Sequence, residues 1–322
     1  MSYDVLLPAP AMPIIAERIA TRARLHQPHL APDPVAALAA VAPDIRALIV
    51  AFHLKVDDAY MAQFPKLQIV SSFGVGYDHI DAKAAAARGV VVAHTPGVLD
   101  AETADTAMGL LLNTVRRFSA AEGYLRAGRW AKEGAFPLSA SLSGRRMGVL
   151  GLGRIGKAIA RRAAAFDVEV VYHGRKPQPE APYLYYPSLI GMAKAVDILM
   201  VAAPGGADTR HIINAEALEA LGPNGVLINI ARGSLIDDDA LIAALRSRKI
   251  LAAGLDVFPH EPQVPSGYLD LDNIVLLPHV GSASHATRRA MANLVVDNLF
   301  AFMDGKGPLA PTPETPWPPR KA

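Results

Sequence analysis

The chain has 322 residues, of which 51% are hydrophobic and 19% are charged, so it can build more than one core and does not resemble a disordered or collagen-like protein. The 32 Lys and Arg residues nearly balance the 30 Asp and Glu residues, and a net charge of +2 gives no basic field that would hold nucleic acid or an anionic membrane. The absence of cysteine excludes disulfides, thiolate metal sites and thiol nucleophiles, and is compatible with the cytoplasmic location that we expect.

The first hundred residues alternate short apolar runs with Ala-rich segments. The runs at 4–7, 45–50 and 67–72 are typical of buried strands, and 14–23 has helical periodicity. No basic segment followed by a sustained apolar run opens the chain, so we expect neither export nor membrane insertion. Residues 100–118 contain good helix formers and predict a long helix that bridges two lobes.

The second half of the chain repeats a strand–helix pattern. A loop at 128–144 precedes an apolar run at 146–150, a glycine turn and an Ala-rich helix. Further strand-like runs follow at 168–172, 198–202, 226–230, 251–255 and 274–277, separated by helix-length spacers. This alternation predicts a mostly parallel sheet. Residues 284–304 predict a second long helix that returns to the first lobe, and the proline-rich tail at 308–322 is expected to be irregular.

Gly151, Gly153 and Gly156 form a GxGxxG motif directly after an apolar strand and at the start of a helix. In this context the first glycine permits the turn, the second lets the backbone approach a pyrophosphate, and the third lets the helix pack on the strand. The amides of the helix N-terminus would hold the phosphates. The motif therefore predicts a dinucleotide site.

The end of the next predicted strand indicates which dinucleotide binds. A site that prefers NAD would carry Asp or Glu there, whereas this chain continues as His173-Gly-Arg-Lys. The guanidinium of Arg175 can hold a 2′-phosphate by charge-assisted hydrogen bonds, and Lys176 adds positive charge. We therefore predict NADP(H) as the cofactor.

Three polar residues follow strand-like runs of the second half: Arg232, Glu261 and His279. Because the carboxyl ends of parallel strands meet at one edge, these side chains are expected to converge there. Arg232 would hold a substrate carboxylate, His279 would pass a proton to a carbonyl oxygen as hydride arrives, and Glu261 would orient the imidazole. No His/Asp/Glu cluster has metal-ligand spacing, so no metal is expected.

Six ordered motifs of the chain resemble those of the D-2-hydroxyacid dehydrogenase family, and within it those of the NADP-dependent glyoxylate/hydroxypyruvate reductases. The matching segments occur in the family's order between about Val70 and Ala290. They are Gly74-Val-Gly-Tyr-Asp-His-Ile-Asp, Ala101-Glu-Thr-Ala-Asp, Gly151-Leu-Gly-Arg-Ile-Gly, Ile230-Ala-Arg-Gly-Ser-Leu-Ile-Asp, Gly254-Leu-Asp-Val-Phe-Pro-His-Glu-Pro and Leu277-Pro-His-Val-Gly-Ser-Ala.

The resemblance implies roles for particular residues. Arg232, Glu261 and His279 would be the family's catalytic set. The substrate would contact Leu54, the backbone amides of Val75 and Gly76, Arg232, His279 and Arg288. Thr103 would lie beside the nicotinamide ribose and Asp256 at the carboxamide end. The cofactor residues as a whole would be Thr103, Gly151, Leu152, Gly153, Arg154, Ile155, Gly156, His173, Arg175, Lys176, Ala203, Pro204, Thr209, Ile230, Ala231, Asp256, His279 and Gly281.

We therefore expect an α/β protein with two Rossmann-like, doubly wound parallel-sheet domains and a cleft between them. Residues 1–99 with 287–322 would form a flavodoxin-like substrate domain, and 100–286 the NADP-binding domain, with both crossings inside long helices. The expected activity is NADPH-dependent reduction of glyoxylate and hydroxypyruvate. A homodimer is expected, because the resemblance places Trp130 and residues 136–138 in the arm that family dimers exchange.

Alternative interpretations stay open. The substrate could be a bulkier aryl or branched 2-oxo acid, which pocket residues 51–55 should decide. A phosphoglycerate dehydrogenase is disfavoured because the acid typical of an NAD site is absent. A non-catalytic dinucleotide sensor similar to the C-terminal-binding-protein corepressors would keep the same fold and catalytic residues, and only turnover would exclude it.

Overall fold

The computed structural model describes residues 3–51 and 54–318 and divides into two compact units. The first unit consists of Met1–Leu99 with Ser284–Ala322, and the second of Asp100–Ala283. The second crossing was predicted after residue 286 and lies at Ser284, because Ser284 is the N-cap residue of a helix that belongs to the first unit. Both crossings therefore lie at the starts of the long helices that begin at Asp100 and His285.

The first unit is built on a five-stranded parallel sheet with the order β2-β1-β3-β4-β5. This is the flavodoxin-like strand order. The strands are β1 (Asp4–Leu6), β2 (Arg24–His26), β3 (Ala47–Ala51), β4 (Ile69–Phe73) and β5 (Val91–Ala93). The short strands β2 and β5 were not predicted. Strand β2 gives little signal because Arg24 and His26 are polar, whereas β5 lies in an apolar run at 90–93 that was overlooked.

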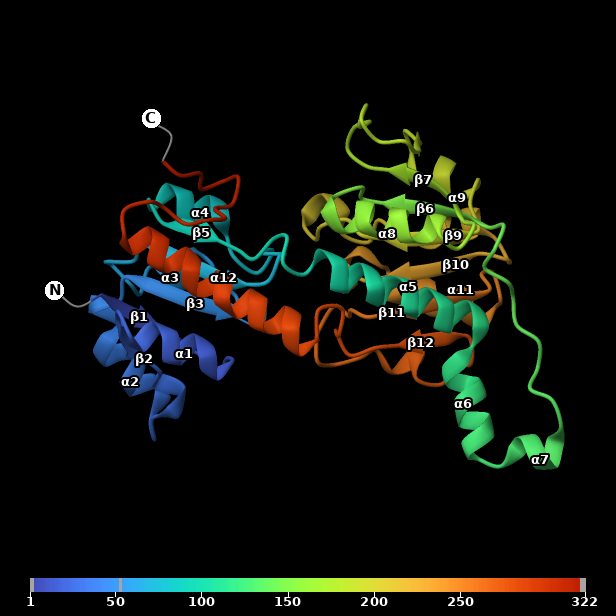
Figure 1. The fold of residues 1–322 in the computed structure, drawn as a ribbon, viewed down its shortest axis with the longest axis horizontal. Helices are drawn as coiled ribbons and strands as arrows, with labels where there is room; N and C mark the ends of the chain where they lie inside the picture. The colour runs from blue at the N-terminus through green and yellow to red at the C-terminus, as the bar shows by residue number, and fades with distance from the viewer. Residues whose placement is uncertain (1–2, 52–53, 319–322) are drawn as a thin grey trace. The chain divides into compact units, whose positions relative to one another are not determined.

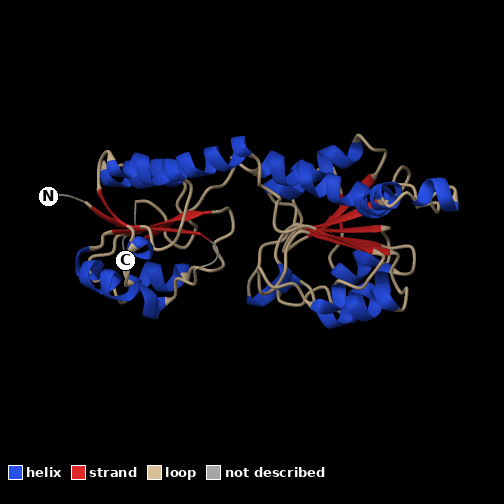
Figure 2. Ribbon diagram, turned by 90° about the horizontal axis from the view of Figure 1, so that it is seen from below, coloured by secondary structure: helices blue, strands red, loops and turns tan. Residues whose placement is uncertain are grey.

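Helices cover both faces of this sheet (Figure 2). One face packs against α1 (Pro13–Ala20) and α12 (His285–Met303), and the other against α2 (Pro34–Val41), α3 (Asp58–Met61) and α4 (Ala82–Ala87). Along β3 the side chains of Leu48 and Val50 enter one core, and those of Ala47 and Ile49 enter the other. This alternation follows from the period of two in an extended strand.

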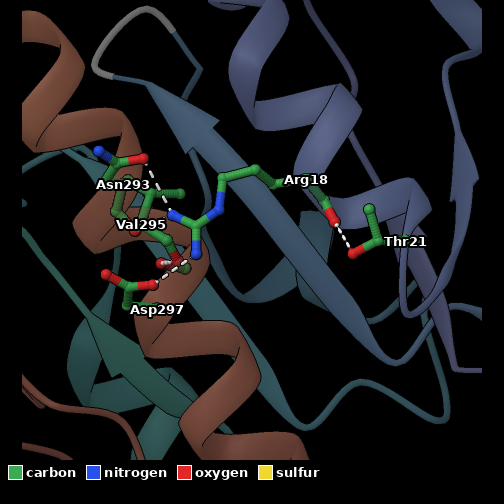
Figure 3. A network of polar contacts seen from close by, with 6 residues as sticks. Arg18, Thr21, Asn293, Val295 and Asp297 are labelled. Atoms are coloured by element: carbon green, nitrogen blue, oxygen red, sulfur yellow. Dashed lines mark hydrogen bonds and ion pairs between the residues drawn. The ribbon is translucent and has the colours of Figure 1, made fainter.

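Polar contacts join α1 to α12 inside the first unit (Figure 3). The Arg18 guanidinium donates to Asn293 Oδ1 at 3.0 Å and forms an ion pair with Asp297 at 2.7 Å. Beneath them, the buried Ser71 hydroxyl on β4 donates to the Val295 carbonyl at 2.9 Å. Helix α12 is therefore fixed to the rest of the first unit although the two are far apart in sequence.

The proline-rich tail lies along β5, the edge strand of the first unit. Pro311 forms an antiparallel bridge with Ala93, Thr312 N donates to the Val92 carbonyl at 2.8 Å, and the Thr315 hydroxyl accepts from Val92 N at 2.8 Å. Between residues 308 and 318, the described part of the tail, no helix or strand forms, yet this segment pairs with the backbone groups of an edge strand that would otherwise be open.

The second unit is built on a seven-stranded parallel sheet with the order β12-β11-β10-β9-β6-β7-β8. The strands are β6 (Arg146–Leu150), β7 (Glu169–His173), β8 (Leu184–Tyr185), β9 (Ile198–Val201), β10 (Val226–Asn229), β11 (Ala252–Leu255) and β12 (Ile274–Leu276). The strand order changes direction between β6 and β9, which is the switch point where doubly wound folds bind ligands. The glycine motif directly follows β6. The predicted fold class of two doubly wound parallel α/β domains is confirmed.

Two helix layers cover the second sheet. Helices α5 (Asp100–Arg116) and α8 (Arg154–Ala164) pack on one face, and α9 (Leu189–Ala193), α10 (Ala215–Leu221) and α11 (Asp238–Arg246) on the other. The predicted single helix at 100–118 ends at Arg116, because Arg117 adopts the left-handed conformation with φ 56°. From there α6 (Phe118–Arg126) and α7 (Arg129–Glu133) project away from the sheet of their unit (Figure 1). Among the described helices, none is long and apolar enough to span a bilayer.

Candidate active site

The turn after β6 shows why glycine is needed at two of its three positions. Gly151 has φ +94°, and a Cβ there would lie 2.7 Å from the Ala203 backbone. A Cβ on Gly156 would lie 2.2 Å from the Gly151 carbonyl oxygen. At Gly153, by contrast, a Cβ would meet no described atom within 4 Å. Packing within the protein therefore explains why glycine is needed at positions 151 and 156, whereas the open space at Gly153 fits the close approach of a pyrophosphate.

Helix α8 begins directly at this turn. Its N-cap residue Gly153 provides no side-chain acceptor for the first amides, and Arg154 and Ile155 form the start of the helix. These amides carry the positive end of the helix dipole, so they suit an anion. Leu152 is buried, and its carbonyl accepts from the Gln178 side chain at 2.8 Å. Gln178, which the sequence analysis missed, thus joins the glycine turn to the loop after β7.

That loop carries the predicted 2′-phosphate residues. His173 ends β7, and its Nδ1 donates to the Tyr186 carbonyl at 2.8 Å. Arg175 and Lys176 are exposed, and in the described part of the chain neither forms a hydrogen bond or an ion pair. Both cations are therefore available to a ligand, and no acidic residue stands beside them at the end of β7.

The loop after β9 lies against the glycine turn. Ala203 is buried and contacts the position of Gly151, and Pro204 follows it. The Thr209 hydroxyl donates to the Pro204 carbonyl at 2.9 Å, which closes the loop on itself. The predicted residues Ala203, Pro204 and Thr209 thus belong to one turn next to β6.

Arg232 follows β10 in a loop that a buried asparagine shapes. The Asn229 side chain accepts from Ala231 N at 3.0 Å and donates to the Arg232 carbonyl at 2.9 Å. Ile230 is buried between the strand and this turn. Asn229 was not singled out from the sequence, although Asn with polar backbone partners two and three residues on is a known turn signal.

The next residue, Gly233, lets the Arg232 loop meet the loop after β11. A Cβ on Gly233 would lie 2.0 Å from the Phe258 carbonyl carbon and 2.3 Å from Pro259 N. The amide of Phe258 in turn donates to Glu261 Oε1 at 2.9 Å. The backbones that carry Arg232 and Glu261 are therefore in direct contact, which only glycine permits at this position.

Glu261 and His279 form a short pair. His279 Nδ1 lies 2.6 Å from Glu261 Oε2, with 26% and 17% of the two side chains exposed. Burial alone would raise the pKa of Glu261, but the hydrogen bonds from His279 and the Phe258 amide, with the charges of His279 and Arg232, hold it below its usual value. Glu261 is therefore a carboxylate at neutral pH, and a carboxylate can only accept, so His279 Nδ1 carries the proton in this pair.

Asp256 holds the loop on which His279 lies. Its two carboxylate oxygens accept from Val280 N at 2.7 Å and Gly281 N at 2.8 Å, and its carbonyl accepts from His279 N at 2.9 Å. Burial raises the pKa of Asp256, although the two amide hydrogen bonds oppose this effect. The Asp256 carboxylate and carbonyl thus hold the backbone around His279.

Thr103 on α5 also reaches this loop. A Cβ on Gly281 would be in ordinary contact with Thr103 Cγ2 at 3.5 Å, whereas the 3.0 Å approach to Asp256 Oδ2 would require that carboxylate to shift. The Gly281 carbonyl accepts from the Thr106 hydroxyl at 3.2 Å. The predicted cofactor and catalytic residues other than Thr103 thus lie at the carboxyl edge of one parallel sheet. They lie at the end of β7, in the loops after β6, β7, β9, β10, β11 and β12, or in the first turn of α8.

The remaining predicted residues lie in the first unit, after β3 and β4 and on α12. Leu54 packs against the core beneath β3, and residues 52–53 of the predicted pocket segment lie outside the described residues. Val75 and Gly76 follow β4 and are half-buried. Arg288, in the first turn of α12, places its guanidinium 5.7 Å from the centre of the Phe73 ring.

Over residues 3–51 and 54–318, no group of three or more His, Asp or Glu side chains could hold a metal ion.

Comparison with known proteins identifies the family. Residues 108–281 match the model of the D-isomer specific 2-hydroxyacid dehydrogenase NAD-binding domain. A hydroxyphenylpyruvate reductase of Plectranthus scutellarioides and a glyoxylate/hydroxypyruvate reductase of Arabidopsis thaliana are 44% and 42% identical over 310 residues, which cover 96% of this chain and 99% of each relative. A crystal structure of the NADPH-dependent glyoxylate/hydroxypyruvate reductase of Sinorhizobium meliloti with NADP and malonate is 48% identical, covers 100% of both chains and has a TM-score of 0.92. The chain therefore belongs to the D-isomer specific 2-hydroxyacid dehydrogenase family.

Proposed function

We propose that this protein reduces small 2-oxo acids such as glyoxylate and hydroxypyruvate to 2-hydroxy acids, with NADPH as the reductant. The observation that carries the proposal is the 2.6 Å pair of His279 and Glu261, which lies on the same sheet edge as the glycine turn. An oriented imidazole beside a dinucleotide turn fits the reduction of a carbonyl group, which needs a proton donor next to the hydride acceptor.

Each residue of the site would have its own role in this reaction. Bound NADPH would supply the hydride that adds to C2 of the oxo acid. Because Nδ1 of His279 is held by Glu261, Nε2 would deliver the proton to the carbonyl oxygen. The positive charge of Arg232, close enough to lower the pKa of Glu261, would attract the anionic substrate. The amides of Val75 and Gly76 would hold its carboxylate.

The preference for NADPH over NADH is supported by the loop after β7. Arg175 and Lys176 are exposed cations, and no carboxylate at the end of β7 would repel a 2′-phosphate. The Sinorhizobium meliloti relative carries NADP in its crystal structure, which favours the same cofactor here.

The decisive test is the initial rate of NADPH and NADH oxidation, followed by the loss of reduced-nicotinamide absorbance, with glyoxylate, hydroxypyruvate, pyruvate and phenylpyruvate. Fast turnover with NADPH and the two smallest polar acids is the expected result. Tight NADPH binding without turnover of any acid would replace the proposal by a non-catalytic dinucleotide sensor.

A second candidate substrate class is the aryl 2-oxo acids. The relative named hydroxyphenylpyruvate reductase is as similar to this chain as the glyoxylate/hydroxypyruvate reductase of Arabidopsis thaliana. Adding hydroxyphenylpyruvate to the same assay separates the two, since a larger kcat/KM with the aryl acid than with glyoxylate would move the protein to that class.

A homodimer is the proposed assembly. Helices α6 and α7 and the segment after them expose large apolar side chains, with Leu125 55%, Trp130 62% and Leu138 99% exposed. A second copy that covers this arm would bury them. Light scattering on the purified protein should give twice the mass of the chain.

We propose that the enzyme lies in the cytoplasm, in line with its lack of cysteine, and cell fractionation tests this proposal.

A further inference from the structure

Residues 94 and 95 hold two successive carbonyl groups of the loop after β4. The Thr95 amide donates to the Gly74 carbonyl at 2.9 Å, and His94 Nδ1 lies 2.8 Å from the Val75 carbonyl oxygen. A carbonyl oxygen can only accept, so Nδ1 of His94 carries the proton and donates it to Val75. Two neighbouring peptide planes are thereby fixed from one side.

The direction of the next two amides follows from peptide geometry. In a trans peptide the carbonyl and the N–H point in opposite directions, and both bonds of this loop are trans. Fixing the Gly74 carbonyl therefore aims the Val75 N–H away from residues 94 and 95, and fixing the Val75 carbonyl does the same for the Gly76 N–H. Neither amide donates a hydrogen bond to any described atom, so this pair can receive an anion.

His94 is itself held firmly. It is buried, and its carbonyl accepts from the Asn298 side chain on α12 at 3.0 Å, while its amide donates to the Ala310 carbonyl of the tail at 3.1 Å. Asn298 is fully buried and also accepts from Ala310 N at 2.9 Å, so one amide side chain joins the helix, the tail and the residue that supports the loop.

Tyr77 adds a second contact between the loop and the tail. Its ring packs edge-on against the His94 imidazole, with centroids 5.2 Å apart. Its hydroxyl donates to Glu314 at 3.1 Å, and burial together with the Glu314 charge raises the pKa of Tyr77 to about 12, so the hydroxyl keeps its proton at neutral pH.

We infer that His94 is a positioning residue for substrate binding: its Nδ1–H holds the Val75 carbonyl and thereby aims the Gly76 amide at the substrate carboxylate. Asn298 and the C-terminal tail fix His94 in this position. The inference rests on the proposed function, in which the Val75 and Gly76 amides bind the carboxylate of the 2-oxo acid.

The test compares His94→Leu with His94→Asn. The two new side chains have nearly the same size, but only Asn places an N–H donor close to the position of Nδ1. We expect His94→Leu to raise the KM for glyoxylate at least about tenfold, the effect of losing one well-aligned hydrogen bond to a charged group. The kcat and the Kd for NADPH should stay within about twofold, and His94→Asn should recover most of the KM.

His29→Leu is the matched control, because His29 Nδ1 also donates to a backbone carbonyl of the first unit, that of Leu7 at 3.1 Å. This variant should lose a similar contact without raising the KM. An equal rise of KM in His94→Leu and His94→Asn would overturn the inference, as would a KM unchanged in both.

A second measurement separates this inference from the proposed function. The backbone order parameter of Gly76, from ¹⁵N relaxation, should be close to the rigid value of about 0.85 in the wild type and His94→Asn, and should fall toward about 0.6 in His94→Leu. This readout needs no turnover. If the wild type reduced no 2-oxo acid, the proposed function would fail while the order parameters still decide whether His94 positions Gly76.

Discussion

Replacing Arg175 by Ala should weaken the use of NADPH and leave the use of NADH almost unchanged. Arg175 is exposed in the loop after β7, and within residues 3–51 and 54–318 its side chain forms no hydrogen bond or ion pair. The substitution therefore removes no contact inside the protein. Whatever kcat/KM is lost measures an interaction with the cofactor alone.

The size of the effect follows from the chemistry of a guanidinium–phosphate contact. A hydrogen bond to a charged group contributes about 1.5–3 kcal/mol, and exposure of the loop to solvent and salt moves the value toward the lower end. Since about 1.4 kcal/mol corresponds to a factor of ten, kcat/KM for NADPH should fall about 10- to 100-fold. NADH lacks the 2′-phosphate, so its kcat/KM should change less than about twofold.

The assay is the initial rate with each cofactor at saturating glyoxylate, for the wild type, Arg175→Ala and Arg161→Ala. Arg161 is an exposed arginine on α8 whose replacement changes the net charge equally, so it controls for general electrostatic attraction. The unfolding temperatures of all three proteins should agree. An equal loss of kcat/KM for NADPH and NADH in Arg175→Ala would refute the reasoning.

Three further predictions concern the catalytic loops. His279→Gln should lower the rate of reduction at least about 100-fold at every pH, because general acid catalysis accelerates such reactions about 10²- to 10⁴-fold. NADPH binding, followed by the fluorescence of the cofactor, should persist. A near-wild-type rate would contradict the proposed role of His279 as proton donor. Gly233→Ala should lower the urea-measured free energy of unfolding by at least about 2 kcal/mol, because the new Cβ would lie 2.0 Å from the Phe258 backbone, which cannot yield as a side chain would. The pKa of Glu261 is lowered on folding, so its ionisation stabilises the fold above the ordinary glutamate value of 4.5, and this contribution is lost as the pH falls through the folded value. The difference in unfolding free energy between the wild type and Glu261→Gln should therefore shrink as the pH falls below about 4.5, and a difference that stays constant under acid would count against the pair.

The parts of the fold that the sequence predicted correctly are those whose cause is local. The glycine turn is an example, because Gly151 needs its positive φ and Gly156 its missing side chain within a few residues of each other. Strands β6, β9 and β10 were predicted correctly for a local reason too, since residues 147–150, 198–201 and 226–228 are buried on both faces and form continuous apolar runs. Family membership, predicted from the ordered motifs, is confirmed by the relatives.

The parts that could not be predicted depend on distant partners. The end of α5 was missed because Arg117, which adopts the left-handed conformation, is a residue type that gives no signal for it. His94 and Asn298 were missed because nothing near either residue in the sequence shows that the two meet. The attachment of the tail to β5 was missed, because it depends on Val92, which is distant in sequence.

The conformation of His279 illustrates how one residue's geometry can be imposed by another. His279 has φ 52°, in the left-handed region that costs a residue with a side chain about 1–2 kcal/mol. Histidine enters this region more often than most residues with a side chain, and here hydrogen bonds hold it there. Its amide donates to the Asp256 carbonyl, and the next two amides donate to the Asp256 carboxylate. Two hydrogen bonds to a carboxylate contribute about 1.5–3 kcal/mol each and can offset the strain. The imidazole is therefore oriented from two sides, by Glu261 at its ring and by Asp256 at its backbone.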